Sequence, residues 1–321
     1  MVEVILRDRR PPVLTPSALP CLRALPTINI TEGCALGCTY CYIQGYSHYP
    51  GPQRVVLFAN TPELLRDELR RKRRRPPRVY FSPSSDAFQY PPQVQDVSLH
   101  TMQVLLDAGV EIAFLTKGFV KPPFLALFAT QPHRIFAQIG ITTLDRRLWR
   151  AFEPRTAPPE MRINTIRGLV AAGIHTTARL DPLIPNLTDC EESLVPLLAA
   201  LHDAGVRELS ASYLFLRPAF AARLTARLNA TVPDAMSGTW GYQSFDGGVS
   251  GGHMLGTDER GRRFERLREL ANAAGLRVRL CRCKNPDLAD APCEIAGPAD
   301  AGDAATLDRR MPQRKLDFGD D

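Results

Sequence analysis

Three cysteines lie within eight residues of the chain, at Cys34, Cys38 and Cys41, with the spacing C-x3-C-x2-C. Thiolates this close together are typical of residues that bind one metal centre. Gly33 precedes the run and Gly37 interrupts it, and both favour a loop that wraps around its ligand. The spacing therefore predicts a metal site formed by this loop.

The number of thiolates limits which metal centres the loop could bind. Three ligands are one short of the four that a structural zinc ion or a cubic iron–sulfur cluster normally takes. A [4Fe–4S] cluster with one open iron fits this number, because a substrate or cofactor can occupy the fourth position. The alternative is a structural zinc site, with Cys21 or His48 as fourth ligand, in a basic nucleic-acid-binding protein without catalysis.

A second pair of thiols, Cys281 and Cys283, lies closer to the C-terminus. A strand is expected over residues 276–281, and side chains i and i+2 of an extended strand share a face, so the two thiols should be neighbours. Arg282 and Lys284 should favour their thiolate forms. We expect the pair to donate a hydrogen atom, to bind a second metal or to capture a thiophilic substrate such as trivalent arsenic. The alternative is two structural thiols.

A basic stretch runs from Arg70 to Arg78 (RRKRRRPPR) and carries seven positive charges on nine residues. The 321-residue chain has a formal net charge of +6, so much of its excess charge lies here. Binding to nucleic-acid phosphates is one interpretation. A solvated helix end is the other, because cations stabilise a helix C-terminus and the stretch lacks aromatic residues that could stack on bases.

Strands alternate with helices along most of the chain and must position these residues. Apolar runs predict the strands, and apolar residues at helical spacing predict the helices, several of which end at a glycine. Strands are expected at 25–30, 79–81, 110–115, 134–141, 174–180 and 206–216, and helices from Thr61, whose side chain should cap the first, and at 96–108, 122–129, 160–172 and 190–204. Such alternation predicts a parallel sheet, either open and doubly wound or an incomplete (β/α) barrel.

Polar side chains follow these strands at their C-terminal ends. The cysteine loop follows the first strand, Ser85 and Asp86 the second, Lys117 the third, Thr142 the fourth and Asp181 the fifth. Because the carboxyl ends of parallel strands meet at one edge of a sheet or barrel, these side chains should form one site.

The motifs also resemble a known family. The run C-x3-C-x-aromatic-C, with Tyr40 as the aromatic residue, is similar to the signature of the radical S-adenosylmethionine (radical SAM) enzymes. The surrounding residues 32–44 (EGCALGCTYCYIQ) resemble the spore photoproduct lyase branch in particular. Further similar motifs follow in the same order and extend the resemblance over about residues 25–220: SSD at 84–86, FLTKG at 114–118, FEP at 152–154 and DPLIP at 181–185.

The resemblance implies a fold and cofactors. The fold would be α/β, a partial (β/α)6 TIM-like barrel of the radical SAM type with a C-terminal extension. The three loop cysteines would bind three irons of a [4Fe–4S] cluster, and the fourth iron would bind the amino and carboxylate groups of S-adenosylmethionine. The resemblance also implies roles for Ser85, Asp86, Lys117 and Thr142 in binding S-adenosylmethionine, and for Tyr40 and Tyr42 in packing on adenine or relaying a hydrogen atom.

One position departs from the branch. Spore photoproduct lyases carry a hydrogen-donating cysteine two residues before the serine of the serine–aspartate pair, where this chain has Pro83. The sequence therefore predicts a radical SAM enzyme with an unidentified small-molecule or metalloid substrate. The alternatives are transfer of the 3-amino-3-carboxypropyl group of S-adenosylmethionine to an acceptor such as arsenite, as in arsinothricin-type biosynthesis, and repair of a DNA lesion.

The expected organisation has four parts. They are an N-terminal extension (1–24), the barrel (25–220), a C-terminal extension (221–295) with a glycine-rich loop at 237–262 and a helix at 263–274, and a disordered tail (296–321). No run approaches the roughly 18 apolar residues of a membrane span, and the N-terminus lacks a signal-peptide core. We expect a cytoplasmic enzyme that has no membrane partner and takes electrons from a flavodoxin- or ferredoxin-type reductant.

Overall fold

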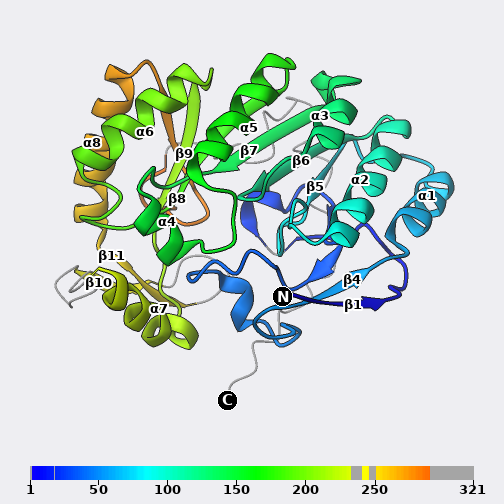
Figure 1. Cartoon of the computed structure of the whole chain (residues 1–321), viewed down its shortest axis with the longest axis horizontal. Coiled ribbons are helices and arrows are strands. Elements are labelled where there is room, and N and C mark those ends of the chain that lie inside the picture. The colour runs from blue at the N-terminus through cyan, green and yellow to red at the C-terminus, as the bar shows by residue number, and fades with distance from the viewer. Residues whose placement is uncertain (1, 18, 233–240, 246–250, 290–321) are drawn as a thin grey trace.

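The computed structural model describes the chain except for residues 1, 18, 233–240, 246–250 and 290–321. Its largest element is a sheet of seven strands in the order β12-β9-β8-β7-β6-β5-β2, and all neighbouring pairs are parallel (Figure 1). The strands are β2 (Thr27–Ile28), β5 (Arg78–Phe81), β6 (Glu111–Thr116), β7 (Ile135–Gly140), β8 (His175–Leu183), β9 (Glu208–Tyr213) and β12 (Arg277–Leu280).

The strands follow one another in the sheet in the same order as in the chain. A doubly wound sheet would reverse its order at a switch point, whereas a (β/α) barrel adds each strand to the same edge. Crossovers of one hand then place the helices on one face and curl the sheet around the other. The expected partial barrel is confirmed, and β12, which follows the predicted barrel in the sequence, joins it beside β9.

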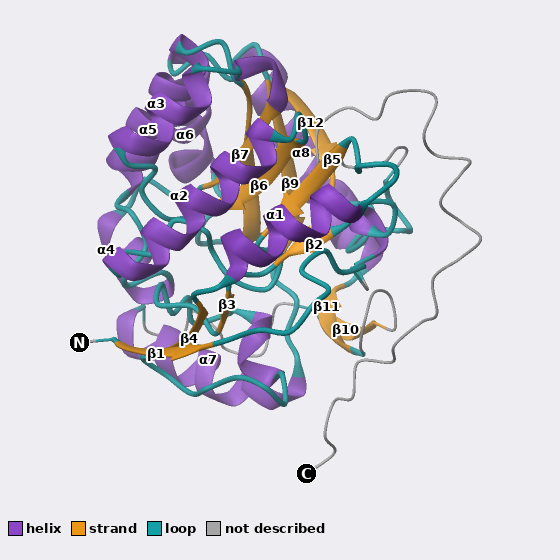
Figure 2. Ribbon diagram, turned by 90° about the vertical axis from the view of Figure 1, so that its right-hand side faces the viewer, coloured by secondary structure: helices purple, strands orange, loops and turns teal. Residues whose placement is uncertain are grey.

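Helices lie outside the strands, as Figure 2 shows. They are α1 (Thr61–Arg71), α2 (Pro92–Asp107), α3 (Pro122–Ala129), α5 (Pro159–Ala171), α6 (Glu191–Asp203) and α8 (Thr257–Ala273). Gly109 and Gly173, which the sequence placed just after two of these helices, both have φ near +74°. That conformation ends a helix at little cost only for glycine.

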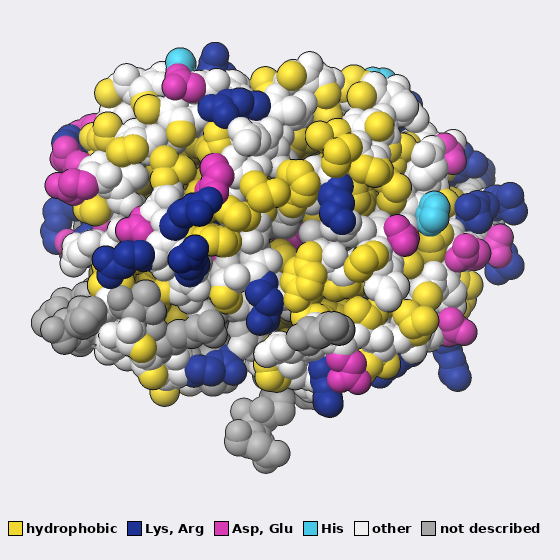
Figure 3. Space-filling model, viewed as in Figure 1, with side chains coloured by type: hydrophobic (Ala, Val, Ile, Leu, Met, Phe, Trp, Pro, Cys, Tyr) yellow, Lys and Arg dark blue, Asp and Glu magenta, His cyan; other side chains and the backbone are white. Residues whose placement is uncertain are grey.

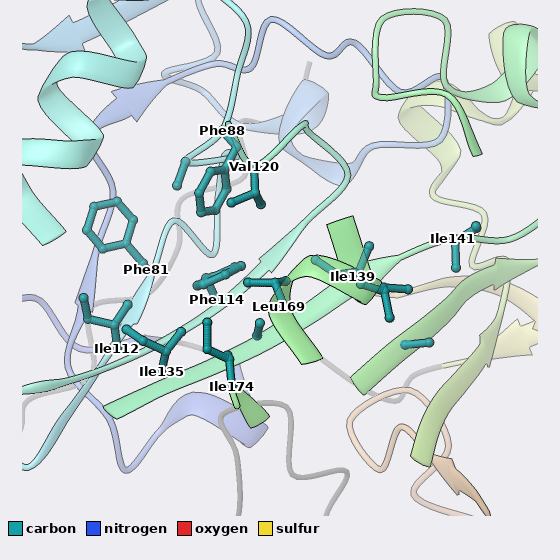
Figure 4. Close-up of a cluster of buried hydrophobic side chains, with 14 of the residues drawn as sticks. Phe81, Phe88, Ile112, Phe114, Val120, Ile135, Ile139, Ile141, Leu169 and Ile174 are labelled. Atoms are coloured by element: carbon teal, nitrogen blue, oxygen red, sulfur yellow. The ribbon is translucent and has the colours of Figure 1, made fainter. Parts of the chain in front are cut away.

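Apolar side chains fill the space between the sheet and its helices (Figure 4). The Phe88 ring lies 4.9 Å from that of Phe114 on β6 and 4.8 Å from that of Phe124 on α3. Ile112 and Ile139 lie fully buried in the same core. Burial of this layer holds the strand ends, and with them the polar side chains at the barrel mouth, in fixed positions.

A second, smaller sheet closes the base of the cysteine loop. It has the order β1-β4-β3 and consists of β1 (Glu3–Arg7), β4 (Arg54–Phe58) and β3 (Thr31–Glu32). β3 ends directly before the loop and β4 begins just after it, and the two strands pair antiparallel. The sequence did not identify this sheet, in which β3 has only two residues and β1 is mostly exposed.

Several local predictions are wrong. The cap of α1 is Asn60 and not Thr61, whose hydroxyl donates instead to the carbonyl of Phe58 at 2.7 Å. Within the expected glycine-rich loop, two strands pair antiparallel, and α8 begins six residues before the helix expected at 263. The expected disordered tail lies outside the described residues. Besides the strands of the second sheet, the sequence did not predict the helices α4 (Arg146–Phe152) and α7 (Pro218–Thr231) or the strands β10 (Tyr242–Phe245) and β11 (Gly252–Leu255).

Candidate active site

The cysteine loop begins at a glycine that the structure requires. Gly33 has φ of +78°, and a Cβ there would lie 2.7 Å from the Pro50 ring and 2.8 Å from the carbonyl oxygen of Arg54. Both the backbone conformation and the available space therefore exclude a side chain. This close approach turns the chain out of β3 and into the loop.

Cys38 is buried, and Cys34 and Cys41 are partly buried. Burial raises the pKa of each thiol, and neighbouring negative groups raise the pKa of Cys34 and Cys38 further. Among the described residues, no three His, Cys, Asp or Glu side chains converge on a point where they could hold a metal ion. A cationic centre beside the three thiols would favour their thiolate forms.

Two side chains hold the backbone of Ala35, next to the first cysteine of the loop. The fully buried Gln89 accepts from the Ala35 N–H through Oε1 at 2.6 Å and donates to the Thr31 hydroxyl at 3.0 Å. From the other side, Arg155 Nε donates to the Ala35 carbonyl at 2.7 Å, and a Cβ on Gly37 would lie only 2.0 Å from its guanidinium. The sequence identified no role for Gln89 because a single buried glutamine leaves no pattern.

Helices α4 and α7 also fix the loop. The carbonyl of Phe152, the last residue of α4, accepts from the Thr39 N–H at 2.8 Å. The Gln44 amide donates to the carbonyl of Cys38 at 2.8 Å, and Arg223 on α7 donates to the Gln44 side chain. Elements that the sequence did not predict therefore position the cysteines.

Glu153 is a buried carboxylate that joins the loop to the barrel. It accepts a hydrogen bond from the Tyr40 phenol and pairs with Lys117 at 3.1 Å and with Arg162. Burial alone would raise its pKa, but the charges of Arg162 and Lys117 and the Tyr40 hydrogen bond lower the pKa of Glu153 to about 2. Arg155, two residues further along the chain, turns instead to the cysteine loop, where it binds the Ala35 carbonyl.

Lys117 crosses the mouth of the barrel from the end of β6. Its Nζ donates to the main-chain carbonyl of Asp181 at 2.7 Å and lies 5.5 Å from the centre of the Tyr40 ring. The main-chain N–H of Lys117 donates to the Asp86 carboxylate at 2.9 Å. A Cβ on Gly140 would lie 2.8 Å from the lysine stem, so the glycine at the end of β7 leaves space for this path.

Ser85 and Asp86, the serine–aspartate pair, differ in their hydrogen bonding. The Asp86 carboxylate is buried and accepts from the Phe88 N–H and the Thr116 hydroxyl, each at 2.8 Å. Burial raises the pKa of Asp86, although these hydrogen bonds oppose the shift. The Ser85 hydroxyl is also buried, and it has no hydrogen-bond partner in the part of the chain that the structure describes. Thr142 is buried two residues beyond the end of β7.

Cys281 lies inside the barrel, and Cys283 does not share its environment. β12 ends one residue earlier, and residues 281–284 form a turn, so the expected shared strand face is wrong. Cys281 is 2% exposed and its Sγ accepts from Arg179 at 3.2 Å, whereas Cys283 is partly exposed. Arg179 and Lys284 both bind the Asp181 carboxylate at 2.7 Å. Their charges lower the pKa of Asp181, although its burial alone would raise it.

Tyr42 opens the short 3-10 turn η2 (Tyr42–Gly45) after the last cysteine. Its phenol donates to the carbonyl of Pro83, and the Arg217 guanidinium carbon lies 5.6 Å from the centre of its ring. Tyr40 and Tyr42 therefore face different partners, although both flank Cys41. Tyr40 faces Glu153 and Lys117.

The basic stretch lies apart from this site. It covers the end of α1, which Figure 1 shows on the opposite side of the molecule from α4 and α7. Its last residue, Arg78, is buried on β5, where it pairs with Glu111 at 2.8 Å and lies over the Phe136 ring at 3.7 Å. The remaining arginines between positions 70 and 75 are exposed.

The chain is similar in sequence to several known proteins. The sequence model of the Radical SAM superfamily matches residues 28–198. An uncharacterized protein of Mycobacterium tuberculosis is 30% identical over 220 residues, and the match covers 64% of this chain and 65% of that protein. A radical SAM Nα-GlyT isomerase of Pseudomonas phage M6 is 27% identical over 175 residues, which are 53% of this chain and 35% of the isomerase.

A solved structure of spore photoproduct lyase, complexed with dinucleoside spore photoproduct, has a similar fold. Its TM-score is 0.63 at 16% identity, over 86% of this chain and 81% of that one. The chain spans about two thirds, 65%, of the length of the mycobacterial relatives. Within the described residues, no helix combines the length and the apolar character that crossing a membrane requires.

Proposed function

The chain belongs to the radical SAM superfamily, and from this membership we propose that it binds a [4Fe–4S] cluster at Cys34, Cys38 and Cys41 and cleaves S-adenosylmethionine reductively. Members of the superfamily are enzymes that use these two cofactors and an external electron donor. When bound, the cluster supplies the electron that breaks a carbon–sulfur bond of S-adenosylmethionine. This membership replaces the alternative of a zinc-stabilised protein without catalysis.

The donor set of the loop fits the cluster. Three thiols whose pKa values burial raises would be protonated on their own, whereas a cationic centre favours the thiolates. Each thiolate of a four-iron cube binds a different iron, so the three sulfur atoms need not converge on one point as they would around a single ion. The hydrogen bonds to Ala35 and from Thr39 hold the loop backbone on both sides of the thiols.

Lys117 and Ser85 are the residues that we expect to bind S-adenosylmethionine. The Ser85 hydroxyl is buried without a protein partner, so a ligand atom there would remove the cost of leaving it unbonded. Lys117 can turn toward the cofactor carboxylate without leaving Glu153 unpaired, because Arg162 holds the other oxygen of Glu153. We assign further cofactor contacts to Tyr40, Tyr42, Asp86 and Thr142, which surround the same mouth.

Cys281 is our candidate for the thiol on the substrate side. A thiol transfers a hydrogen atom to a carbon radical, so that a C–H bond forms and the S–H bond breaks. One electron from the external reductant and one proton from solvent then restore the thiol. Its burial beside Arg179 supports this role over Cys283, which lies in the turn beyond it. In the alternative aminocarboxypropyl transfer, the same thiol would bind arsenite.

We propose an unidentified small-molecule or metalloid substrate for the reaction. Pro83 supports a chemistry different from that of spore photoproduct lyase, because proline offers no sulfur-bound hydrogen. Repair of a DNA lesion is the second candidate, supported by the fold shared with spore photoproduct lyase, which was solved in complex with dinucleoside spore photoproduct. None of the seven described cysteines forms a disulfide, which supports a cytoplasmic location.

Product analysis of S-adenosylmethionine cleavage tests these reactions. The protein would be reconstituted anaerobically with iron and sulfide and reduced with dithionite. 5′-Deoxyadenosine is the product of adenosyl-radical chemistry, whereas methylthioadenosine is the product of aminocarboxypropyl transfer. A reconstituted protein that holds a full cluster but forms neither product would contradict the proposed function.

A further inference from the structure

A cluster of arginines lies beside the cysteine loop. Residues 34–53 contain no Lys, Arg, Asp or Glu, while residues 146–152 and 217–231 together contain six arginines and no Asp or Glu. These last two segments are α4 and α7 with its N-cap, and α7 packs against both α4 and η2. Figure 3 shows Lys and Arg side chains gathered on this part of the molecule, over α4 and α7.

Arg147 and Arg150 of α4 and Arg223 of α7 are exposed, while the apolar faces of the two helices are joined. Leu148 and Phe152 of α4 pack with Leu224 and Leu228 of α7 in one buried cluster, against which Tyr40 of the cysteine loop also packs. The opposite face of α4 is exposed and carries its arginines. The positive surface is therefore fixed in place relative to the loop.

Short hydrogen-bonded connections link this surface to the cysteines. Phe152 at the end of α4 accepts from the N–H of Thr39, which follows Cys38 directly. Arg223 on α7 donates to Gln44, whose amide donates to the carbonyl of Cys38. Because the rate of electron transfer falls steeply with distance, a protein that reduces a cluster in this loop should dock where the surface lies closest to it.

We propose that Arg147, Arg150 and Arg223 form the docking surface for an acidic one-electron carrier protein that reduces the cluster. This inference rests on the proposed function. In each encounter one electron passes from the reduced carrier to the cluster, and the carrier leaves oxidised. Opposite charges on the two surfaces speed the encounter and set its orientation.

The chemistry of the surface favours such a carrier over a nucleic acid. Proteins that bind single strands present exposed aromatic rings on which the bases stack. Of the large hydrophobic side chains that are exposed in the described residues, none lies on α4 or η2 or at those positions of α7 whose side chains the structure describes. The indole of Trp149 on α4 is partly buried and donates instead to the Thr156 hydroxyl at 2.9 Å.

Charge reversal on α4 tests the proposal against a matched control. Arg147→Glu/Arg150→Glu changes the docking surface, and Arg73→Glu/Arg74→Glu makes the same change of charge on the exposed basic stretch beyond α1. With reduced flavodoxin as donor at low salt, we expect the α4 variant to cleave S-adenosylmethionine about tenfold more slowly than the control or wild type. With dithionite as donor, wild type and both variants should cleave S-adenosylmethionine at equal rates. The difference in rate seen with flavodoxin should disappear at high salt.

A binding titration makes the docking surface testable independently of catalysis. Oxidised flavodoxin, followed by the fluorescence of its flavin, should bind wild type and control alike and the α4 variant about tenfold more weakly. Equal affinities and equal flavodoxin-driven rates would overturn the proposal. Loss of binding to a fluorescent DNA oligonucleotide in the α4 variant, with unchanged flavodoxin binding, would assign the surface to nucleic acid instead. Failure of wild type to cleave S-adenosylmethionine with dithionite would contradict the proposed function. The flavodoxin titration would still show whether the carrier binds at the proposed docking surface.

Discussion

Arg179 and Cys281 meet across strand β9: the guanidinium Nη2 on β8 donates to the Sγ beyond β12 at 3.2 Å. Ser210, on the strand between them, also accepts from Arg179 at 3.3 Å, so the three side chains project from the same face of the sheet. Asp181 extends the contact, since its carboxylate binds Arg179 and its carbonyl binds Lys117. A continuous polar chain therefore connects Cys281 with the residues around the cysteine loop.

Replacing Cys281 should separate cofactor cleavage from product formation. Cys281→Ala should retain its iron and sulfide and cleave S-adenosylmethionine with dithionite within about twofold of wild type, because the thiol does not contact the cysteine loop. In a cell extract that supplies the substrate, it should consume S-adenosylmethionine without forming the closed-shell product, as judged by mass spectrometry. Cys283→Ala is the matched control and should form that product. Normal product from Cys281→Ala would remove the thiol from the chemistry.

The three loop cysteines should be individually indispensable. Cys34→Ala, Cys38→Ala and Cys41→Ala each leave an iron of the cluster without its thiolate, so cleavage of S-adenosylmethionine should fall by at least about a hundredfold. Iron and sulfide content and the electron paramagnetic resonance of the reduced protein check the cluster itself. Cys190→Ala, at the start of α6, removes a thiol far along the chain from the loop and should change neither property. Turnover retained by any of the three loop variants would refute the assignment.

Glu153 should make stability depend on acid pH. Its folded pKa of about 2 lies below its ordinary value of 4.5, so its contribution is fully present above about pH 5 and is lost as the pH falls toward 2. Glu153→Gln leaves the buried charge of Arg162 without its partner and should cost about 3–5 kcal/mol in the free energy of unfolding at pH 7. Urea unfolding of the cluster-free chain should show this difference shrinking between pH 5 and pH 3. A difference that stays constant over this range would mean that the carboxylate charge contributes nothing.

The sequence predicted the barrel well because strands such as β5, β6 and β7 are mostly buried, largely apolar runs that helices follow. It predicted the cysteine loop and Lys117 because their positions are fixed by motifs at strand ends. It failed at α4, whose three arginines in seven residues hide the apolar face that packs on α7. It also failed at Cys281, because one residue decides whether a thiol belongs to a strand or to the turn that follows. Neighbours distant in sequence, such as Gln89 and Ala35, leave no local signal at all.

Gln89 offers a test of how firmly the loop must be held. Gln89→Leu keeps the approximate volume but leaves the buried Ala35 N–H without its acceptor, which should cost about 1–3 kcal/mol of stability. The control is Gln138→Leu, which removes another buried glutamine, one that donates to Ser210 inside the barrel and makes no bond to the loop. Gln138→Leu should cost less stability in urea, because the Gln138 Oε1 is buried without a partner among the described residues, and only Gln89→Leu should bind less iron and sulfide on reconstitution. If both variants reconstitute as fully as wild type, the Gln89 hydrogen bond serves folding alone, and Arg155 with the α4 contact suffices to position the thiols.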